Sequence, residues 1–173
     1  MIYNGWDMDT MKNHDFREIY ISVDVEANGA IPGEYSLFSL GAFLAGGLTK
    51  DGEYVAFEPD EDMVFYVEMK PISEKFDPRA IRVGVLEGFD DTIPDLTGQR
   101  RFDWSVNHGD DPEAAMNRFA EWTVSKKKEY GCRPVFMAYP ASFDWLFVYW
   151  YFSYFNIQSP FGFSGVLDLK TLY

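Results

Sequence analysis

Apolar and polar residues alternate along the segment 19–26, where isoleucine and valine occupy every second position. A period of two is typical of a β-strand with one buried face. A second strand is predicted at about 35–45, ended by Gly46-Gly47, and a third extended stretch is interrupted at Pro59-Asp60 and resumes at 63–69. Short turns between consecutive strands predict an antiparallel meander in this part of the chain.

The pattern becomes helical after Pro71. The clearest helix begins at Pro112, follows the capping residue Asp111 and ends before Gly131, a residue type that suits the position after a helix. Residues 88–110 show no period and are predicted to form a loop or insertion. The remaining predicted elements are a short helix over 78–86, a strand over 134–139, a helix over 141–155 and a strand over 166–169.

Three meander strands followed by a strand, a helix and a strand predict a mixed five-stranded sheet flanked by helices. Right-handed crossovers would place the later strands parallel to the first. This order of elements is the ribonuclease H-like arrangement, an α/β fold. Residues 1–17 have no period and are predicted to form a flexible N-terminal arm, while residues 18–173 form a single domain.

The composition is that of a globular chain, with 47% hydrophobic and 25% charged residues, and it excludes general disorder. Acidic residues outnumber basic ones 28 to 15, which gives a net charge of −13. Such a field repels polyanions, so non-specific binding to duplex DNA through a broad basic surface is not expected. The composition does not exclude a nucleic-acid substrate that binds at a small site where metal ions neutralise its charge.

A single cysteine, Cys132, rules out an internal disulfide, and the first residues lack the basic and apolar regions of a signal peptide. The most aromatic stretch, 143–155, is too short to span a bilayer and contains Asp144. We therefore expect a cytoplasmic protein that does not contact membranes. The residues leave the oligomeric state open, with a homodimer as one alternative.

Two acidic side chains, Asp24 and Glu26, leave the same face of the first predicted strand, about 6–7 Å apart along it. Carboxylates this close repel each other unless a cation joins them, and hard divalent ions such as Mg²⁺ take oxygen ligands. The alternative is that both acids are solvated on the wet face of an edge strand. The regular apolar spacing of residues 19–25 and the low frequency of Asp in strands count against it.

A third acid, Asp144, stands at the start of a helix that is apolar on nearly every side. Such a helix is expected to be buried on most faces, so an acid there needs a reason. One reason is structural, because an early carboxylate complements the helix dipole, with Ser142 as the cap. The other is that Asp144 converges with Asp24 and Glu26 at one sheet edge and completes a two-metal carboxylate site.

Two sequence motifs resemble those of the DEDD 3′–5′ exonucleases of the DnaQ-like superfamily. YISVDVEANG resembles the first motif, Asp-x-Glu on the leading strand, and FMAYPASFDWLF resembles the second, a strand and a turn followed by Phe-Asp at a helix start. SGVLDLKTLY is similar to the next strand of the family, and its Asp168 matches a segment that is not catalytic. The resemblance covers about residues 18–173.

The third motif of the family, a histidine followed a few residues later by an aspartate on a final helix, has no counterpart. His14 precedes the first strand, His108 falls in the predicted insertion, and the sequence ends at Tyr173, where that helix is expected to begin. We expect either a truncated chain without its last helix or a member that has lost the general base and the fourth ligand. Tyr139-Pro140 also replaces the His-Asn that is frequent in the second motif.

The resemblance implies a two-metal 3′–5′ exonuclease that hydrolyses terminal phosphodiester bonds of single-stranded DNA or RNA and releases nucleoside 5′-monophosphates. Asp24, Glu26 and Asp144 are then the catalytic residues, as ligands of two Mg²⁺ or Mn²⁺ ions. The turn Ala27-Asn28-Gly29 matches the place where the family contacts the terminal nucleotide, and no residue can be assigned as the base. The competing interpretation is a non-catalytic ribonuclease H-like module that binds a protein or nucleic acid without cutting it.

Basic side chains would then contact the substrate phosphates locally. The candidates are Arg79, Arg82, Arg100, Arg101 and Lys126–Lys128. The alternative for the lysine run is a solvated helix end. Phe38 is a candidate for stacking on an unpaired base, with core packing as the alternative.

Overall fold

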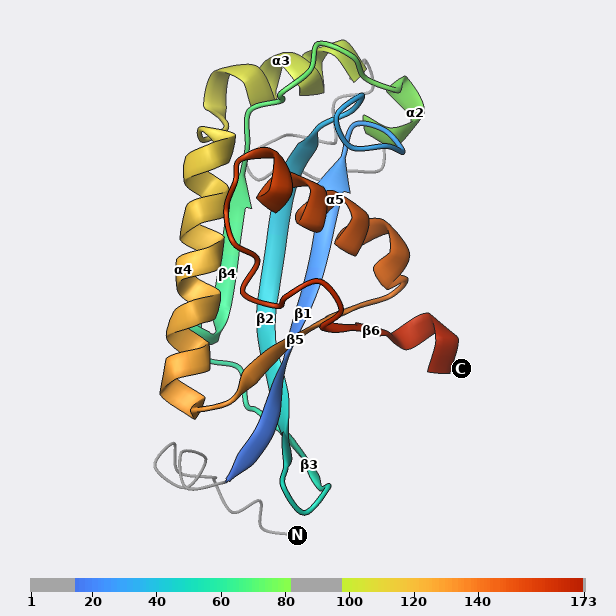
Figure 1. Ribbon diagram of the computed structural model, residues 1–173. Helices are drawn as coiled ribbons and strands as arrows, with labels where there is room; N and C mark the ends of the chain where they lie inside the picture. The colour runs from blue at the N-terminus through green and yellow to red at the C-terminus, as the bar shows by residue number, and fades with distance from the viewer. Residues whose placement is uncertain (1–14, 82–97, 173) are drawn as a thin grey trace, which may run out of the picture.

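A mixed β-sheet flanked by helices organises the protein, and the computed structural model describes residues 15–81 and 98–172 (Figure 1). The strands are β1 (Phe16–Ala27), β2 (Leu37–Thr49), β3 (Tyr54–Ala56), β4 (Val64–Glu68), β5 (Arg133–Ala138) and β6 (Val166–Asp168). The α-helices are α2 (Pro78–Ile81), α3 (Gly98–His108), α4 (Pro112–Tyr130) and α5 (Ala141–Tyr154). Two short 3₁₀ helices, η1 (Glu61–Met63) and η2 (Leu169–Leu172), complete the described elements.

The sheet has the order β3-β2-β1-β5-β6, with β4 also paired to β2. β1 pairs antiparallel with β2, and it pairs parallel with β5 from Glu18 opposite Arg133 to Ser22 opposite Met137. Both β3 and β4 run antiparallel to β2, which confirms the predicted meander. The predicted third strand is divided into these two short strands, so the sheet has six strands where the sequence analysis expected five.

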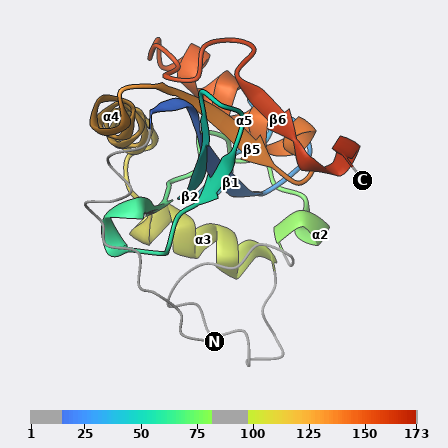
Figure 2. The same cartoon turned by 90° about the horizontal axis from the view of Figure 1, so that it is seen from below.

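Helices α4 and α5 lie on one side of the sheet and α2 and α3 on the other, as the view from below shows (Figure 2). The apolar positions of β1 are the centre of the core, and each of Ile19, Ile21, Val23 and Val25 is at most 4% exposed. Burying a side chain of this size contributes about 1.5–3 kcal/mol, so the alternating pattern is enough to orient the strand.

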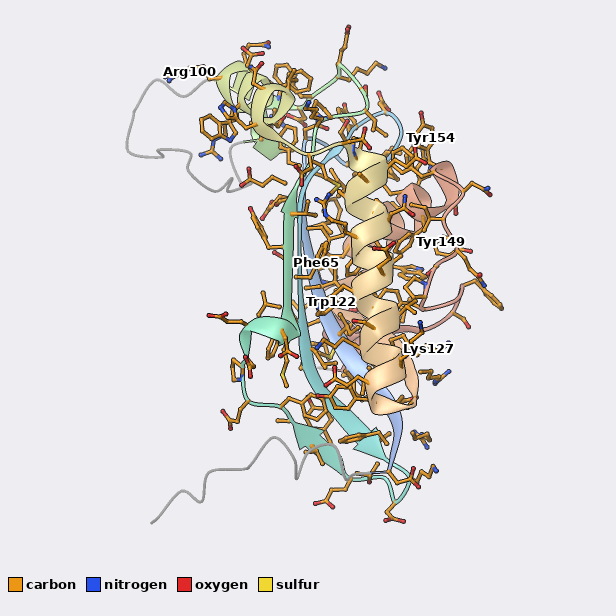
Figure 3. All side chains as sticks on the ribbon, turned by 90° about the vertical axis from the view of Figure 1, so that its left-hand side faces the viewer. Phe65, Arg100, Trp122, Lys127, Tyr149 and Tyr154 are labelled. Atoms are coloured by element: carbon orange, nitrogen blue, oxygen red, sulfur yellow. The ribbon has the colours of Figure 1, made fainter. Side chains whose placement is uncertain are left out.

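Aromatic rings join α4 to the edge of the sheet. Phe65 of β4 lies 5.3 Å from the ring of Phe119 and 5.9 Å from that of Trp122, both on α4 (Figure 3). The limits of α4 are those predicted, because the Asp111 carboxylate accepts the N–H of Ala114 at 2.9 Å and Gly131 has a φ of 65°. No helix in residues 15–81 and 98–172 has the length and apolar character needed to cross a membrane.

The structure moves two predicted boundaries. β1 begins at Phe16, within the predicted arm 1–17, because the Phe16 ring is buried in the core; residues 1–14 lie outside the described residues. β2 continues to Thr49 through Gly46-Gly47, which were expected to end it. A Cβ on Gly47 would lie 2.5 Å from the Phe16 ring, so the glycines here make room for aromatic neighbours instead of forming a turn.

The prediction of a loop over 88–110 is wrong for its second half, which forms α3; residues 82–97 lie outside the described residues. Phe102 anchors this helix through rings 6.4 Å from Phe38 and 5.2 Å from Phe76. The Arg101 guanidinium donates to the carbonyl of Ile81 at 3.0 Å. Tertiary contacts therefore stabilise this helix through its buried face, which consists of Gly98, Arg101, Phe102 and Ser105.

Candidate active site

The site lies where β1 continues beyond its parallel partner. The pairing of β1 with β5 ends at Ser22 and Met137, while β1 itself runs on to Ala27. Past this point the N–H of Val25 donates to Oδ1 of Asp144 on α5, at 3.0 Å. Ligands of open α/β sheets bind outside the carboxyl ends of parallel strands, which is the position of this contact.

The structure brings the three predicted acids within electrostatic range of one another. Asp144 is only 5% exposed, Glu26 is half-buried, and Asp24 is exposed. Burial, together with the charges of Asp24 and Asp144, raises the pKa of Glu26 to about 7. Burial and the charge of Asp24 raise the pKa of Asp144 to about 6, against the opposing effect of its bond from the Val25 amide.

The chemistry of these donors suits a hard divalent cation. All three offer carboxylate oxygens, and no basic side chain in residues 15–81 and 98–172 forms an ion pair with any of them. Their mutual repulsion is what a cation would relieve, since an opposite charge favours the ionised form. As the side chains stand, however, no three His, Cys, Asp or Glu residues in the described ranges are arranged to hold a metal ion.

Asp168 positions the helix that carries Asp144. Its Oδ1 accepts the N–H of Ala141, the first residue of α5, at 3.3 Å, and the N–H of Lys170 at 3.0 Å. Ser142, expected to cap this helix, is exposed, and α5 has no cap bond from a nearby side chain. A residue from β6, 27 positions away in the sequence, therefore satisfies the helix start.

Replacing Asp168 with Ala is expected to lower the free energy of unfolding by about 1 kcal/mol, the usual cost of a lost helix cap. It should also weaken metal-dependent stabilisation, because α5 then holds Asp144 less firmly. Asp111→Ala, which removes the cap of α4, is the matched control. Urea unfolding with and without millimolar Mn²⁺ measures both effects, and an equal Mn²⁺ response in the two variants would contradict the positioning role.

A pocket of about 310 Å³ opens beside Glu26. Its lining residues are Glu26, Ala27, Gly29, Ala30, Asp77, Ala80 and Phe143. Two of the three residues predicted to contact substrate, Ala27 and Gly29, therefore face this space. Asn28 does not, because it is fully buried and its side chain bonds to Ser36 and Lys75. The prediction for Asn28 is corrected to a role inside the protein.

The described basic candidates are divided between residues that bond within the protein and residues that are exposed. Lys126 is buried, and its ammonium binds Asp62 at 2.9 Å and Glu129 at 3.2 Å. Arg79 is exposed on α2, the short helix whose Ala80 lines the pocket. Arg82 lies outside the described residues, and Arg100, Lys127 and Lys128 are exposed on α3 and α4. Phe38 is 2% exposed, which supports core packing over stacking on a base.

Sequence reasoning missed Asp77, Ala80 and Phe143 as pocket residues. Phe143 precedes Asp144 in the second motif, so its position could have been inferred from the sequence. Asp77 and Ala80 belong to a segment with no strand pattern, and only the tertiary structure places them beside β1. Asp77 itself caps α2, since its Oδ1 accepts the N–H of Arg79 at 2.8 Å.

Comparison with known proteins is consistent with this geometry. The chain is 40% identical over 157 residues to an Escherichia coli protein named 3′-5′ DNA exonuclease Cap18, with 91% of this chain and 68% of that protein covered. No protein-family model matches the sequence.

Solved structures of E. coli exonuclease I have the same fold. A complex with a 5cy-dA13 oligonucleotide gives a TM-score of 0.55 at 14% identity, covering 88% of this chain and 28% of that one. The metal-free form of an exonuclease I–ssDNA complex gives 0.57 at 13%, covering 90% and 29%. This chain thus spans less than a third of exonuclease I. The fold, the two motifs and the 40% identical relative together show that the chain belongs to the DEDD, DnaQ-like 3′–5′ exonuclease superfamily.

Proposed function

We propose that the chain carries the nuclease site of a metal-dependent 3′–5′ exonuclease that removes nucleotides from single-stranded DNA. The observation that supports this most strongly is the set of three acids, Asp24, Glu26 and Asp144, which form no ion pair with any described residue and lie beside a pocket of about 310 Å³. Burial and mutual repulsion make this set costly for the metal-free fold. A substrate-binding role that uses cations accounts for that cost.

In this proposal the three carboxylates hold Mg²⁺ or Mn²⁺, with two ions as the family resemblance implies. Such ions would neutralise the charge of the scissile phosphate and acidify the attacking water. The Val25 N–H fixes the orientation of Asp144. Glu26 is the one of the three acids that lines the pocket. The products would be nucleoside 5′-monophosphates. No described residue is assigned as the general base.

The pocket suits the terminal nucleotide by size and lining. Ala27 has only a methyl side chain, so a sugar can approach the backbone closely there, and the half-buried Phe143 ring offers an apolar surface. The acids and Asp77 make the pocket negative, which disfavours a phosphate there unless cations are present. Metal dependence and substrate binding are therefore coupled in this proposal.

A second candidate is a non-catalytic module with this fold. It is favoured by the side-chain arrangement in the described ranges, where no three potential ligands enclose an ion. It is disfavoured by the burial of Asp144, because its hydrogen bond from the Val25 N–H offsets only part of the cost of burying a carboxylate that has no ion-pair partner among the described residues.

The test is degradation of single-stranded DNA labelled at its 5′ end, with 1–10 mM Mg²⁺ or Mn²⁺ as order-of-magnitude concentrations, or with chelator. Progressive shortening from the 3′ end and release of 5′-monophosphates are expected with metal only. An RNA of the same sequence, assayed in parallel, decides the sugar preference. Binding of the strand without any shortening would favour the non-catalytic module.

A further inference from the structure

Three completely buried polar side chains link the elements around the candidate site. Asn28 follows β1, Ser36 precedes β2, and Tyr151 lies on α5, and each is 0% exposed. The N–H of Ser36 donates to Oδ1 of Asn28 at 2.6 Å, and the N–H of Asn28 donates to the Ser36 carbonyl at 2.9 Å. Tyr151 is joined to Ser36 through the next residue in the chain, because the N–H of Leu37 donates to the Tyr151 hydroxyl oxygen. We call these three residues the buried network.

The buried network also binds the segment 72–77, which has no strand or helix of its own. The Ser36 hydroxyl oxygen accepts the N–H groups of Ile72 and Ser73 at 3.0 and 3.1 Å. On the other side, the Asn28 amide donates to the carbonyl of Lys75 at 3.1 Å. The backbone carbonyl of Asn28 accepts the N–H of Asp77 at 2.7 Å. These bonds satisfy backbone groups that have no partner from regular secondary structure.

The segment 72–77 leads directly into α2, and together they supply one wall of the pocket through Asp77 and Ala80. The end of β1 also lines the pocket, through Glu26 and Ala27, which directly precede Asn28. Figure 1 shows the β1–β2 connection next to α2 at the same end of the sheet. The width of the pocket is therefore set through Asn28 and Ser36.

Tyr151 connects the same network to the helix that carries Asp144. The two residues are seven positions apart, so they lie on the same face of α5. The Tyr151 hydroxyl oxygen accepts the N–H of Leu37 at 2.8 Å, which fastens α5 to the start of β2. The buried network thus contacts both the segment 72–77, which leads into the pocket wall, and α5, the helix that carries Asp144.

We propose that Asn28 and Ser36 are positioning residues for substrate binding: they hold the α2 wall against β1 at the width that accepts the terminal nucleotide. The inference rests on the proposed function, because it assigns the pocket to the substrate. Neither side chain touches the pocket, so both act through the wall that they fasten. A loosened wall impairs binding of the terminal nucleotide more than it impairs the acids, which lie on β1 and α5.

The test compares Asn28→Ala and Ser36→Ala with the control Thr49→Val. Thr49 is also buried and accepts the N–H of Glu53 at 3.0 Å, but at the opposite end of β2. Hydrogen exchange of the amides in 72–77 is measured first, and KM and kcat for single-stranded DNA second. We expect exchange to accelerate and KM to rise, each by about tenfold or more, with kcat within about threefold. Thr49→Val is expected to change neither the exchange rate of the amides in 72–77 nor KM.

The outcomes separate the two proposals. Unchanged exchange in both variants overturns the anchoring by the buried network, whatever the activity. Faster exchange with an unchanged KM overturns the substrate role of the wall, and so does an equal rise of KM in Thr49→Val. A wild-type protein that neither binds nor shortens single-stranded DNA overturns the proposed function and the substrate role together, while the exchange rates still decide the anchoring.

Discussion

Replacing Asp144 with Asn is expected to lower the rate of metal-dependent DNA degradation by at least about 10²-fold. Removing a group that merely supports a metal ligand costs 10- to 100-fold in affinity or activity, and loss of a ligand should cost no less. Asn keeps the shape of Asp and an oxygen that can accept the N–H of Val25, so the helix should stay in place. The change thus removes the charge while retaining the main structural contact.

The control for this prediction is Asp51→Asn, which makes the same change of net charge in the exposed turn between β2 and β3. Initial rates at saturating Mn²⁺, together with far-ultraviolet circular dichroism, compare the two variants. The control should retain full activity. If Asp144→Asn also retained activity within about threefold, the acid would not be a ligand and α5 would carry only a structural carboxylate.

In the absence of metal, the protein is expected to lose stability as the pH rises from about 4.5 to about 7. Folding raises the pKa of Glu26 from 4.5 to about 7, and that of Asp144 from 3.8 to about 6. The folded form therefore binds protons more tightly than the unfolded chain. This contribution is complete below the unfolded pKa values and is lost as the pH rises through the folded ones.

Glu26→Gln removes the contribution of one of these two acids to the loss of stability. At pH 8 with chelator, the variant is expected to exceed the wild type by on the order of 1 kcal/mol, a value reduced from the full shift because Glu26 is half-exposed and screened by solvent. At pH 4.5 the two proteins should be nearly equal. Urea unfolding at several pH values measures the difference, and Glu58→Gln, at an exposed position, is the control.

With millimolar Mg²⁺ at pH 8, the wild type should become more stable than Glu26→Gln. An ion that binds only the folded state stabilises it by mass action. The wild type is expected to gain melting temperature with metal, whereas Asp24→Asn and Glu26→Gln should gain much less. Equal metal shifts in wild type and Asp24→Asn would argue for solvated acids and for the non-catalytic interpretation.

Local patterns predicted the elements whose determinants are close in sequence. The alternation in 19–26 specifies β1, because one buried face follows from a period of two. Asp111 and Gly131 mark the ends of α4, since capping depends on residues within a turn of the helix. The three acids were found for the same reason: Asp24 and Glu26 are neighbours on one strand, and Asp144 is conspicuous on an apolar helix.

Long-range contacts decided the remainder. The continuation of β2 through Gly46-Gly47 depends on aromatic rings from other elements, and α3 forms where Phe102 can pack on Phe38. A local pattern carries no information on such partners.

The site shows the same division between local and long-range determinants. Asp168 rather than Ser142 satisfies the start of α5, and Asn28 is drawn inward by backbone groups of 72–77 instead of facing substrate. The sequence by itself determined which carboxylates are available and on which elements they stand. Only the tertiary structure decided what surrounds them, because an unpaired buried N–H or carbonyl takes whichever partner the fold brings within about 3 Å, however distant that partner is along the chain.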